Sequence, residues 1–305
     1  MTNAIIVGEV GDPHVEAVVS SLKRSAVILD AASLSSTEYE LRDGVLHVGS
    51  NATSAIDPKH LARGWIRRLA PVTWMVDVGV ESREAASRAA WLTLLSAILR
   101  SDSVDWLSRV DSIARAENKL VVDDAARACA VPMPRTVVTN SAARLAALEV
   151  DSVVVKPLGP GHYIEGGIAY NVFAKSVSLA AITDANLKDA PFLVQERLRA
   201  TRHLRIVTVR NEAWAAALDA DGLPLDWRAE PSAHEAFTDW KLDEATRHRA
   251  LMVTARLGLG FSSQDWVVTQ SGTYLLDVNP GGQWLFLPSA VSSSVAQAIA
   301  SWLDA

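Results

Sequence analysis

YLLDVNPGGQW, residues 274–284, is the stretch that decides the fold. Within it Asp277 and Asn279 are two residues apart, so on a β-strand their side chains leave the same face. Asp265 lies in another strand-like run, residues 263–268, and the segment QSGT between the two runs is typical of a hairpin turn. The hairpin would bring three oxygen-bearing side chains to one point, where a hard cation such as Mg²⁺ would find the ligands that it prefers. The alternative is a hairpin with polar residues on its solvated face.

The composition is that of an ordinary globular protein. The chain has 305 residues, of which 49% are hydrophobic and 21% charged, enough for two or three compact lobes. The formal charge of −6 leaves no excess of basic residues to pair with a nucleic-acid backbone. The single cysteine, Cys129, excludes an internal disulfide and fits a reducing compartment. No apolar run approaches the roughly 20 residues needed to cross a bilayer, so we predict a cytoplasmic protein with neither a nucleic-acid nor a membrane partner.

The beginning of the chain has the pattern of an open α/β sheet. Strands are expected over residues 4–7 and 26–30, on either side of a helix over residues 14–23. A hairpin is expected to turn at Asp43-Gly44. Helical spacing then predicts three helices, the last of them stopped by a proline, over residues 81–100, 104–116 and 119–130.

The second half of the chain mixes strands with helices in α+β fashion. Strands are expected over residues 152–157, 168–173, 192–196, 204–209 and 214–218, and a helix over residues 247–257. The predicted organisation has three parts: an N-terminal α/β domain over residues 1–115, a central lobe over residues 116–200 and a C-terminal lobe over residues 201–305. The first of these parts carries no residue that we assign to chemistry.

Lys156 ends an apolar strand directly before a glycine-rich loop, residues 158–167. A lysine in this place could contact a nucleotide phosphate as a point charge, while backbone N–H groups of the loop cover the phosphates. The loop is no P-loop, because the pattern GxxxxGK[ST] does not occur. Gln195 and Glu196 end the next apolar strand, where backbone groups could meet an adenine edge, and Arg205 could contact phosphate. The alternative is that Lys156 simply ends a strand at the surface.

The order of these residues along the chain resembles the ATP-grasp ligase family. More closely, it resembles the ATP-grasp peptide maturases that build graspetides, the macrocyclic peptides to which the microviridins belong. The resemblance covers about residues 65–288 and is strongest after residue 115. It rests on the segments Asn118-Lys119-Leu120, Pro134 to Asn140, Asp226-Trp227-Arg228 and Asn279-Pro280-Gly281-Gly282-Gln283-Trp284.

The resemblance implies an ATP-grasp fold, in which a central and a C-terminal lobe clamp ATP behind an N-terminal pre-ATP-grasp domain. Lys119 and Lys156 would contact the phosphates, and the hinge of Gln195, Glu196, Arg197 and Leu198 would hold the adenine. Asp265, Asp277 and Asn279 would hold Mg²⁺. Arg205 and Arg228 would lie near the transferred group.

The resemblance also implies a reaction and a partner. A substrate carboxylate would attack the γ-phosphate of ATP, and a hydroxyl or an amine would attack the acyl phosphate to give an ester or an amide. The implied substrate is an acidic ribosomal precursor peptide, leader plus core, whose Asp or Glu side chains are joined to Ser, Thr or Lys. Related enzymes are often dimers, so a homodimer is one expected state.

Two departures from the family pattern keep other functions open. The family usually has glutamate where this chain has Asp277, and no acidic residue lies beside His203 to contact a ribose. One alternative is a ligase that joins free amino acids or small carboxylates. The other is a nucleotide-binding or peptide-binding relative without turnover.

The remaining histidines give no signal of a metal site. His14, His234 and His248 lack the spacing of zinc ligands. No zinc site is therefore expected.

Overall fold

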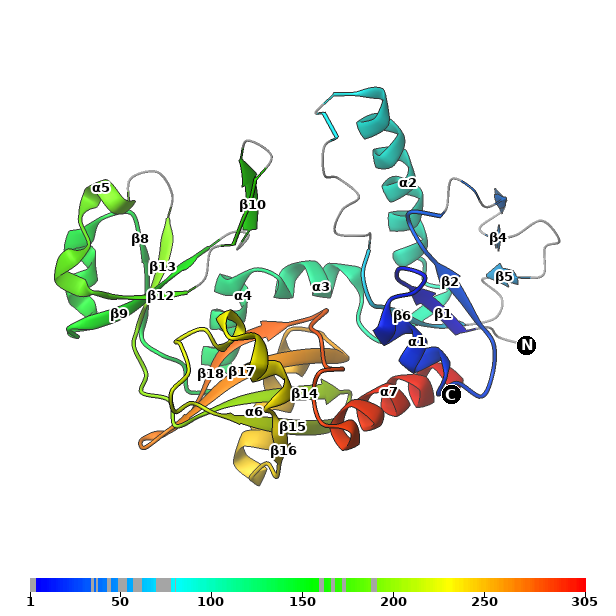
Figure 1. Ribbon diagram of the computed structural model, residues 1–305. Helices are drawn as coiled ribbons and strands as arrows, with labels where there is room; N and C mark the ends of the chain where they lie inside the picture. The colour runs from blue at the N-terminus through cyan, green and yellow to red at the C-terminus, as the bar shows by residue number, and fades with distance from the viewer. Residues whose placement is uncertain are drawn as a thin grey trace.

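The computed structural model describes residues 4–33, 36, 38–42, 45–48, 54–56, 62–69, 78–79, 81–158, 162–165, 168–171, 174–187 and 191–305. Figure 1 shows an N-terminal unit, a central lobe that stands apart from it, and a C-terminal lobe below both. No helix in these ranges combines the length and the apolar character that crossing a membrane requires.

The N-terminal unit is built on a parallel sheet with the order β2-β1-β6-β7, which confirms the expected open α/β sheet. The strands are β1 (Ala4–Val7), β2 (Ala26–Leu29), β6 (Ala62–Ile66) and β7 (Val104–Trp106). All four residues of β1 are buried, as expected for a strand covered on both faces. The helices are α1 (Pro13–Val19) and α2 (Arg83–Leu99). Asp12 caps α1, because its side chain accepts the N–H of His14 at 2.7 Å.

A small antiparallel sheet belongs to the same unit. The strands β3 (Tyr39–Arg42), β4 (Val45–Val48) and β5 (Ser54–Ile56) pair in that order. The pairing of β3 with β4 confirms the predicted hairpin, although Asp43 and Gly44 of the turn lie outside the described residues.

The helix expected over residues 104–116 was wrong in its first part. Val104–Trp106 is strand β7, and helix α3 covers only Val110–Ala116. The reason is tertiary pairing: β7 lies parallel to β6, and the ring of Trp106 lies against Gly64, where an added Cβ would overlap it. Helix α4 (Lys119–Ala128) agrees with the sequence and is capped by Asn118, whose side chain accepts the N–H of Leu120.

The central lobe is an antiparallel sheet with its own small core. The sheet has the order β12-β9-β13-β8, formed by β8 (Thr136–Thr139), β9 (Ser152–Pro157), β12 (Lys175–Ser178) and β13 (Phe192–Glu196). A separate hairpin consists of β10 (His162–Glu165) and β11 (Ile168–Asn171). The short helices are η2 (Ala142–Leu148), η3 (Leu179–Ala181) and α5 (Asp184–Leu187). The buried residues of this core are Leu145, Leu148, Val153, Leu187 and Val194.

The C-terminal lobe is a five-stranded antiparallel sheet with the order β16-β15-β14-β17-β18. Its strands are β14 (Arg202–Val209), β15 (Glu212–Asp219), β16 (Thr238–Trp240), β17 (Phe261–Thr269) and β18 (Gly272–Asn279), with the short helices η4 (Trp227–Ala229) and η5 (Pro231–Glu235) before β16. Helix α6 (Glu244–Arg256) packs against β14, β15 and β17, and Gly258 follows it with a φ of +73°. The hairpin predicted around residues 263–279 is therefore present.

Helix α7 (Ser289–Asp304), which the sequence analysis did not identify, packs the end of the chain against its beginning. It contacts α1, β1 and β6 of the N-terminal unit as well as β14 and β15. Its buried positions Val291, Val295, Ile299 and Leu303 recur every four residues and so form one helical stripe. These residues share a hydrophobic cluster with Ala4, Ile6, Val207 and Val209. The N-terminal unit and the C-terminal sheet thus share a core, from which the core of the central lobe is separate.

Gly260 lies at the junction between the N-terminal unit and the C-terminal sheet, where we expect any larger residue to destabilise the fold. A Cβ added to Gly260 would overlap the backbone carbonyl of Leu107, and the N–H of Gly260 donates to Ser108 Oγ at 3.0 Å. We expect Gly260→Ala to lower the free energy of unfolding by about 1–3 kcal/mol, because the backbones must move apart. Urea unfolding measures this change. Gly79→Ala is the control, because its added Cβ would come no closer than 3.9 Å to Ser82; equal effects of both substitutions would contradict the prediction.

Candidate functional site

The predicted oxygen-bearing residues lie in cross-strand positions of the C-terminal sheet. Arg205 on β14 lies opposite Asp265 on β17, and Asp265 lies opposite Asp277 on β18. The register between β17 and β18 shifts next to Asp265, so that Trp266 pairs with Leu275 and Leu276 is the additional residue of a β-bulge. The bulge keeps Trp266 and Leu275 in the core while it places Asp277 beside Asp265.

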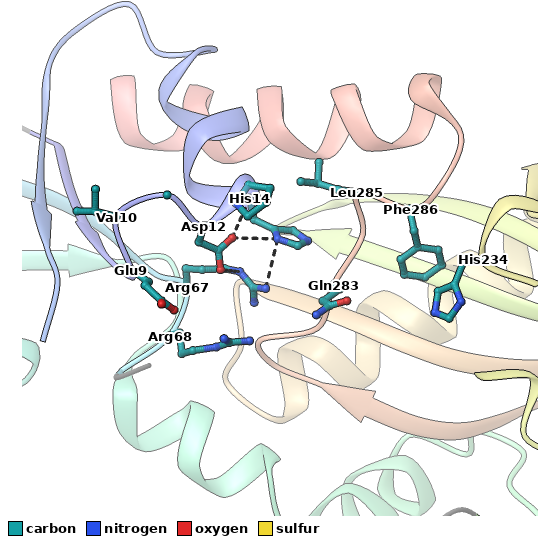
Figure 2. A pocket seen from close by; sticks show the side chains of 12 residues that line it. Glu9, Val10, Asp12, His14, Arg67, Arg68, His234, Gln283, Leu285 and Phe286 are labelled. Carbon is teal, nitrogen blue, oxygen red and sulfur yellow. Dashed lines mark hydrogen bonds and ion pairs between the residues drawn. The ribbon is translucent and has the colours of Figure 1, made fainter. Parts of the chain in front are cut away.

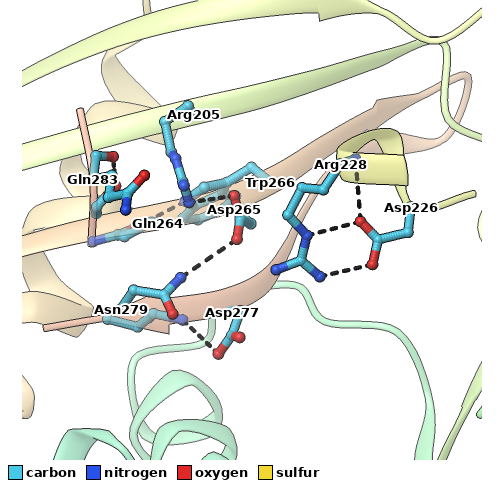
Figure 3. A network of polar contacts seen from close by, with 11 residues as sticks. Arg205, Asp226, Arg228, Gln264, Asp265, Trp266, Asp277, Asn279 and Gln283 are labelled. Atoms are coloured by element: carbon cyan, nitrogen blue, oxygen red, sulfur yellow. Dashed lines mark hydrogen bonds and ion pairs between the residues drawn. The ribbon is translucent and has the colours of Figure 1, made fainter. Parts of the chain in front are cut away.

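Figure 3 shows how these side chains meet. Arg205 Nη1 donates to Asp265 Oδ1 at 2.6 Å, and Asn279 Nδ2 lies 3.4 Å from Asp265 Oδ2. Asp277 Oδ1 accepts the N–H of Val278 at 2.9 Å. The side chain of Arg205 is 10% exposed, and its Nε–H has no hydrogen-bond partner in the described structure. The three oxygen-bearing side chains are therefore brought together, and Arg205 retains a donor beside them.

Burial and like charge act on the two carboxylates at this point. Burial raises the pKa of Asp277, and the negative charge of Asp265 raises it further. Burial lowers the pKa of Lys156, whose ammonium group is attracted by both carboxylates. A bound cation would relieve the repulsion between Asp265 and Asp277.

The donor set at this point suits a hard cation. Two carboxylates and an amide oxygen fit Mg²⁺, which keeps waters or phosphate oxygens as its other ligands. In the described ranges no group of three or more His, Cys, Asp or Glu residues forms an all-protein metal cluster. The residues present therefore fit a cation that is shared with a phosphate.

A buried polar network fixes the opposite face of β17. Gln264 is fully buried, and its Nε2 donates to the carbonyl of Ala250 on α6 at 2.9 Å. Gln264 Oε1 accepts the indole N–H of Trp266 at 2.8 Å. Thr208, Thr254 and Ser262 complete the network through hydroxyl contacts of 2.8–3.0 Å. Because neighbouring strand residues point to opposite faces, this anchoring of Gln264 and Trp266 also fixes Asp265 between them. The sequence analysis assigned no role to the network.

A cavity of about 340 Å³ lies between the central sheet and the C-terminal sheet. Nine of the eleven predicted site residues line it: Lys119, Lys156, Gln195, Glu196, Leu198, Arg228, Asp265, Asp277 and Asn279. Apolar side chains, including Val154, Leu204, Val267 and Leu276, line it as well. The combination of cationic, anionic and apolar walls can receive a ligand that carries both charged groups and an apolar ring.

Two predicted residues are not among those that line the cavity. Arg197 is exposed and makes no hydrogen bond or ion pair within the described part of the chain. Arg205 reaches the site only through its contact with Asp265. Lys119, at the first turn of α4, approaches the carbonyl of Pro157 at 3.4 Å, beside Lys156.

The side chains at the end of β13 are engaged by the protein itself. Gln195 Nε2 donates to Thr136 Oγ1 at 3.0 Å. The carboxylate of Glu196 accepts the backbone N–H of Arg135 at 2.9 Å and its Nε–H at 3.0 Å. These contacts occupy polar atoms of both side chains, and the backbone N–H of Glu196 donates to the carbonyl of Arg135 at 2.9 Å.

Asp226 is a site residue that the sequence analysis quoted in a motif but did not assign. It is buried and accepts Arg228 Nε at 2.8 Å and Arg228 Nη2 at 2.7 Å (Figure 3). Burial acts to raise the pKa of Asp226, but its hydrogen bonds with Arg228 and the charge of Arg228 hold it below its usual value. The spacing of two residues before Arg228, at the N-cap of η4, was the available signal. Asp226 therefore aims the guanidinium of Arg228 into the cavity.

His203 lies in the segment where the resemblance led us to expect an acidic residue, and the segment contains none. His203 lines the cavity, and burial lowers its pKa, although Asp265 and Asp226 act in the opposite direction. The imidazole is therefore a neutral hydrogen-bonding group. Of the glycine-rich loop, Gly159, Pro160, Gly161, Gly166 and Gly167 lie outside the described residues.

The loop after Asn279 is held by the N-terminal unit. A Cβ on Gly282 would lie 2.5 Å from Ser263 Cβ and 3.1 Å from Asn279 Cβ, so only glycine allows this close approach. Trp284 is fully buried, with its ring 4.4 Å from that of His14. Arg67 Nη1 donates to the carbonyl of Gly281 at 2.5 Å. The N-terminal part, to whose residues the sequence analysis assigned no chemistry, therefore supports this loop.

Comparisons with known proteins rest on the three-dimensional structure. No family model matches the chain, and no curated protein matches it in sequence. Solved structures match over nearly its whole length.

One similar structure is a RiPP-associated ATP-grasp ligase from Chryseobacterium gregarium in complex with ADP and a leader and core peptide. It has a TM-score of 0.86 and 17% identity, over 99% of this chain and 96% of that one. A second is the macrocyclase MdnC from Microcystis aeruginosa MRC bound with the precursor peptide MdnA. Its TM-score is 0.81 and its identity 19%, over 99% of each chain.

A third is the ATP-grasp ligase PsnB in complex with a phosphomimetic variant of a minimal precursor, Mg and ADP. Its TM-score is 0.76 and its identity 16%, over 99% of this chain and 98% of that one. These likenesses confirm the fold expected from the sequence: the chain has the ATP-grasp fold, in the form that RiPP-associated ATP-grasp ligases share.

Proposed function

We propose that this protein is an ATP- and Mg²⁺-dependent ligase that activates a carboxylate as an acyl phosphate. The observation that carries the proposal is the cavity between the two sheets, where Lys119, Lys156 and Arg228 face Asp265 and Asp277. Cations and a paired-carboxylate site at one end of an apolar-walled cavity suit a nucleoside triphosphate with its metal. The ATP-grasp fold and the ADP and Mg in similar structures support this assignment.

Each residue would have a defined task in the reaction. Lys119 and Lys156 would bind phosphate oxygens, and the segment from Gln195 to Leu198 would hold the adenine. Asp265, Asp277 and Asn279 would hold Mg²⁺, which would neutralise phosphate charge when bound. Arg228, aimed by Asp226, and Arg205, aimed by Asp265, would orient the attacking carboxylate and the transferred group.

The chemistry then needs no covalent bond to the protein. A carboxylate oxygen of the substrate attacks the γ-phosphorus, the bond to the β-phosphate oxygen breaks, and ADP leaves. A hydroxyl or an amine attacks the acyl carbon, phosphate leaves, and an ester or amide remains. The substrate loses one water in total for each ATP that is converted to ADP and phosphate.

The substrate that we propose is a ribosomal precursor peptide with a leader and an acidic core, whose Asp or Glu side chains are joined to Ser, Thr or Lys. The peptides bound to the Chryseobacterium ligase and to MdnC support a peptide partner. We also propose a cytoplasmic location, for which the single cysteine is the support, and a homodimer as one assembly state.

The decisive experiment follows ADP release and peptide mass together. The purified protein is incubated with ATP, Mg²⁺ and the acidic peptide encoded beside its gene. We expect peptide-dependent ADP release and a peptide mass that falls in steps of one water. A ligase for free amino acids would instead release ADP with glutamate and other amino acids but not with the peptide. A protein that binds ATP without turnover would release no ADP with either.

Asn279→Ala tests the proposed metal site. Removal of the amide oxygen should lower the rate of ADP release by at least about 100-fold. The reason is that Mg²⁺ would lose a ligand and would no longer neutralise the charge of the phosphates. The fold should persist, because Asn279 is only partly buried and Asp265 keeps Arg205. Steady-state ADP release and a thermal unfolding curve measure both effects. Asp239→Ala, at an exposed position of β16, is the control; unchanged activity of Asn279→Ala would remove Asn279 from the site.

Asp277→Asn should make the ligand-free protein more stable and inactive. The pKa of Asp277 is raised in the folded state above 3.8, so the ionised carboxylate costs stability at every pH above its folded pKa. The gain should be largest above the folded pKa, should shrink as the pH falls through that pKa, and should vanish below the ordinary value of 3.8, where the carboxyl is protonated in both the folded and the unfolded state. Thermal unfolding at a series of pH values measures it. A lower midpoint for Asp277→Asn at pH 7 would contradict the prediction.

A further inference from the structure

A second cavity, of about 500 Å³, lies between the N-terminal unit and the C-terminal lobe. One side is the loop before α1, with Glu9, Val10 and Asp12, and the other is the chain from Gln283 to Phe286 together with His234 (Figure 2). Its volume is within the range of about 300–1,000 Å³ that is usual for ligand sites. The residues that line it have no task in the activation of a carboxylate as described above.

Three charged or titratable side chains in its wall are engaged with one another. Arg67, whose side chain is 2% exposed, lies 3.3 Å from Asp12 Oδ2 and donates to Gly281. His14 Nδ1 lies 3.0 Å from Asp12 Oδ1, and His14 Nε2 lies 3.3 Å from the N–H of Trp284. Burial, together with the charge of Arg67, lowers the pKa of His14 to about 4. The neutral imidazole therefore donates from Nδ1 to Asp12 and accepts at Nε2, and this cluster forms a fixed wall.

Four other polar side chains of the lining remain available. Among the described residues, no hydrogen bond or ion pair reaches the side-chain polar atoms of Glu9, Arg68, Gln283 or His234. Figure 2 places Glu9 and Arg68 at one end of the cavity and His234 at the other, with Gln283 between them. The cavity thus has a charged end of mixed sign and an end with a free imidazole.

His234 is held by its ring, which leaves its nitrogen atoms free. The ring lies edge-on to Trp227, with centroids 4.9 Å apart, and edge-on to Phe286 at 5.5 Å. Both of these aromatic residues also lie close to residues of the proposed reaction centre. Trp227 lines the first cavity directly before Arg228, and the guanidinium of Arg205 lies 5.5 Å from the ring of Phe286. The ring of Phe286 therefore lies between His234 and Arg205, and the ring of Trp227, which also contacts His234, belongs to a residue that lines the first cavity.

We propose that this second cavity receives the acceptor side chain of the substrate, a hydroxyl or an amine, and that His234 takes its proton. The inference rests on the proposed ligase function and adds a site and a residue to it. The acceptor oxygen or nitrogen attacks the acyl carbon, the bond from that carbon to the phosphate oxygen breaks, and the proton of the acceptor passes to a ring nitrogen of His234. Phosphate leaves, and the imidazolium returns its proton to solvent.

The end of the second cavity that carries Glu9 and Arg68 has charges of both signs, which suits the part of a peptide substrate beyond the acceptor side chain. Arg68 can pair with an acidic side chain of the core, and Glu9 and Gln283 can accept or donate hydrogen bonds with its backbone. The carboxylate donor and the acceptor would then approach from two cavities, and Phe286, in the wall of the second, lies 5.5 Å from the guanidinium of Arg205. This division accounts for polar side chains of the second cavity that have no hydrogen-bond or ion-pair partner among the residues that the structure describes.

The test separates activation from bond formation. His234→Phe keeps an aromatic ring against Trp227 and removes the nitrogens, and His234→Gln keeps polarity without a base. His248→Phe, at an exposed position of α6, is the matched control. Each variant is incubated with ATP, Mg²⁺ and the acidic peptide encoded beside the gene. ADP, water loss from the peptide and, with added hydroxylamine, peptide hydroxamate are measured.

We expect both His234 variants to retain ADP release and hydroxamate formation, because activation is intact and hydroxylamine needs no base. Water loss per ADP should fall by about 100-fold, because the acyl phosphate is hydrolysed before the acceptor attacks. The control should match the wild type.

Two results would overturn the inference. Unchanged water loss per ADP in both variants would make His234 a packing residue only. A joint loss of ADP, hydroxamate and water loss would place its effect on activation or on the fold. No peptide-dependent ADP from the wild type is a different result, because it would overturn the proposed function and the inference with it.

Discussion

The ion pair between the buried Arg205 and the partly buried Asp265 is the contact that positions the other polar side chains of the site. The two residues lie opposite each other on β14 and β17, at 2.6 Å between Nη1 and Oδ1. The charge of Arg205, whose side chain is 10% exposed, needs a partner at this depth, and Asp265 supplies it. Asp265 in turn orients Asn279, and the bulge in β18 adds Asp277 to the same row. One ion pair thus fixes the position of the row of side chains at which we propose that a cation and a phosphate bind.

Two supports keep this row in position from outside the cavity. On one face of the sheet, Gln264 connects β17 to α6 through a network of buried hydrogen bonds. Because this network fixes the backbone of β17, it also fixes the position from which the side chain of Asp265 extends. On the other side, Arg67 and His14 hold the chain from Gly281 to Trp284, directly after Asn279. The N-terminal unit is therefore a structural part of the site. The shared hydrophobic clusters explain why it can be, since α7 packs the first strand and the last sheet into one core.

The central lobe stands in a different relation to the other parts. Its core of Leu145, Leu148, Val153, Leu187 and Val194 is its own, and it supplies Lys156 and the end of β13 to the first cavity. The cavity therefore lies between a separately packed lobe and a sheet that is joined to the rest of the chain. This arrangement gives a ligand contacts from both parts, with Lys156 from the central lobe and Asp265, Asp277 and Arg228 from the C-terminal lobe.

Features that depend only on neighbouring residues, such as strand alternation and turns, could be predicted from the amino-acid sequence alone. The alternation of residues 274–279 and the turn before them were enough to place Asp277 and Asn279 on one face of a hairpin, and an apolar strand before a glycine-rich loop was enough to single out Lys156. Only the tertiary structure decided the bulge at Leu276, the strand at Val104–Trp106 and the contact of Arg67 with Gly281, 214 residues away. The physical reason is that pairing between distant strands and the burial of charges depend on which surfaces meet, and no local pattern records that. For the same reason no signal in the sequence pointed to His234, which has no metal-ligand spacing. We could propose it as a proton acceptor only from the structure, where its ring lies against Trp227 and Phe286.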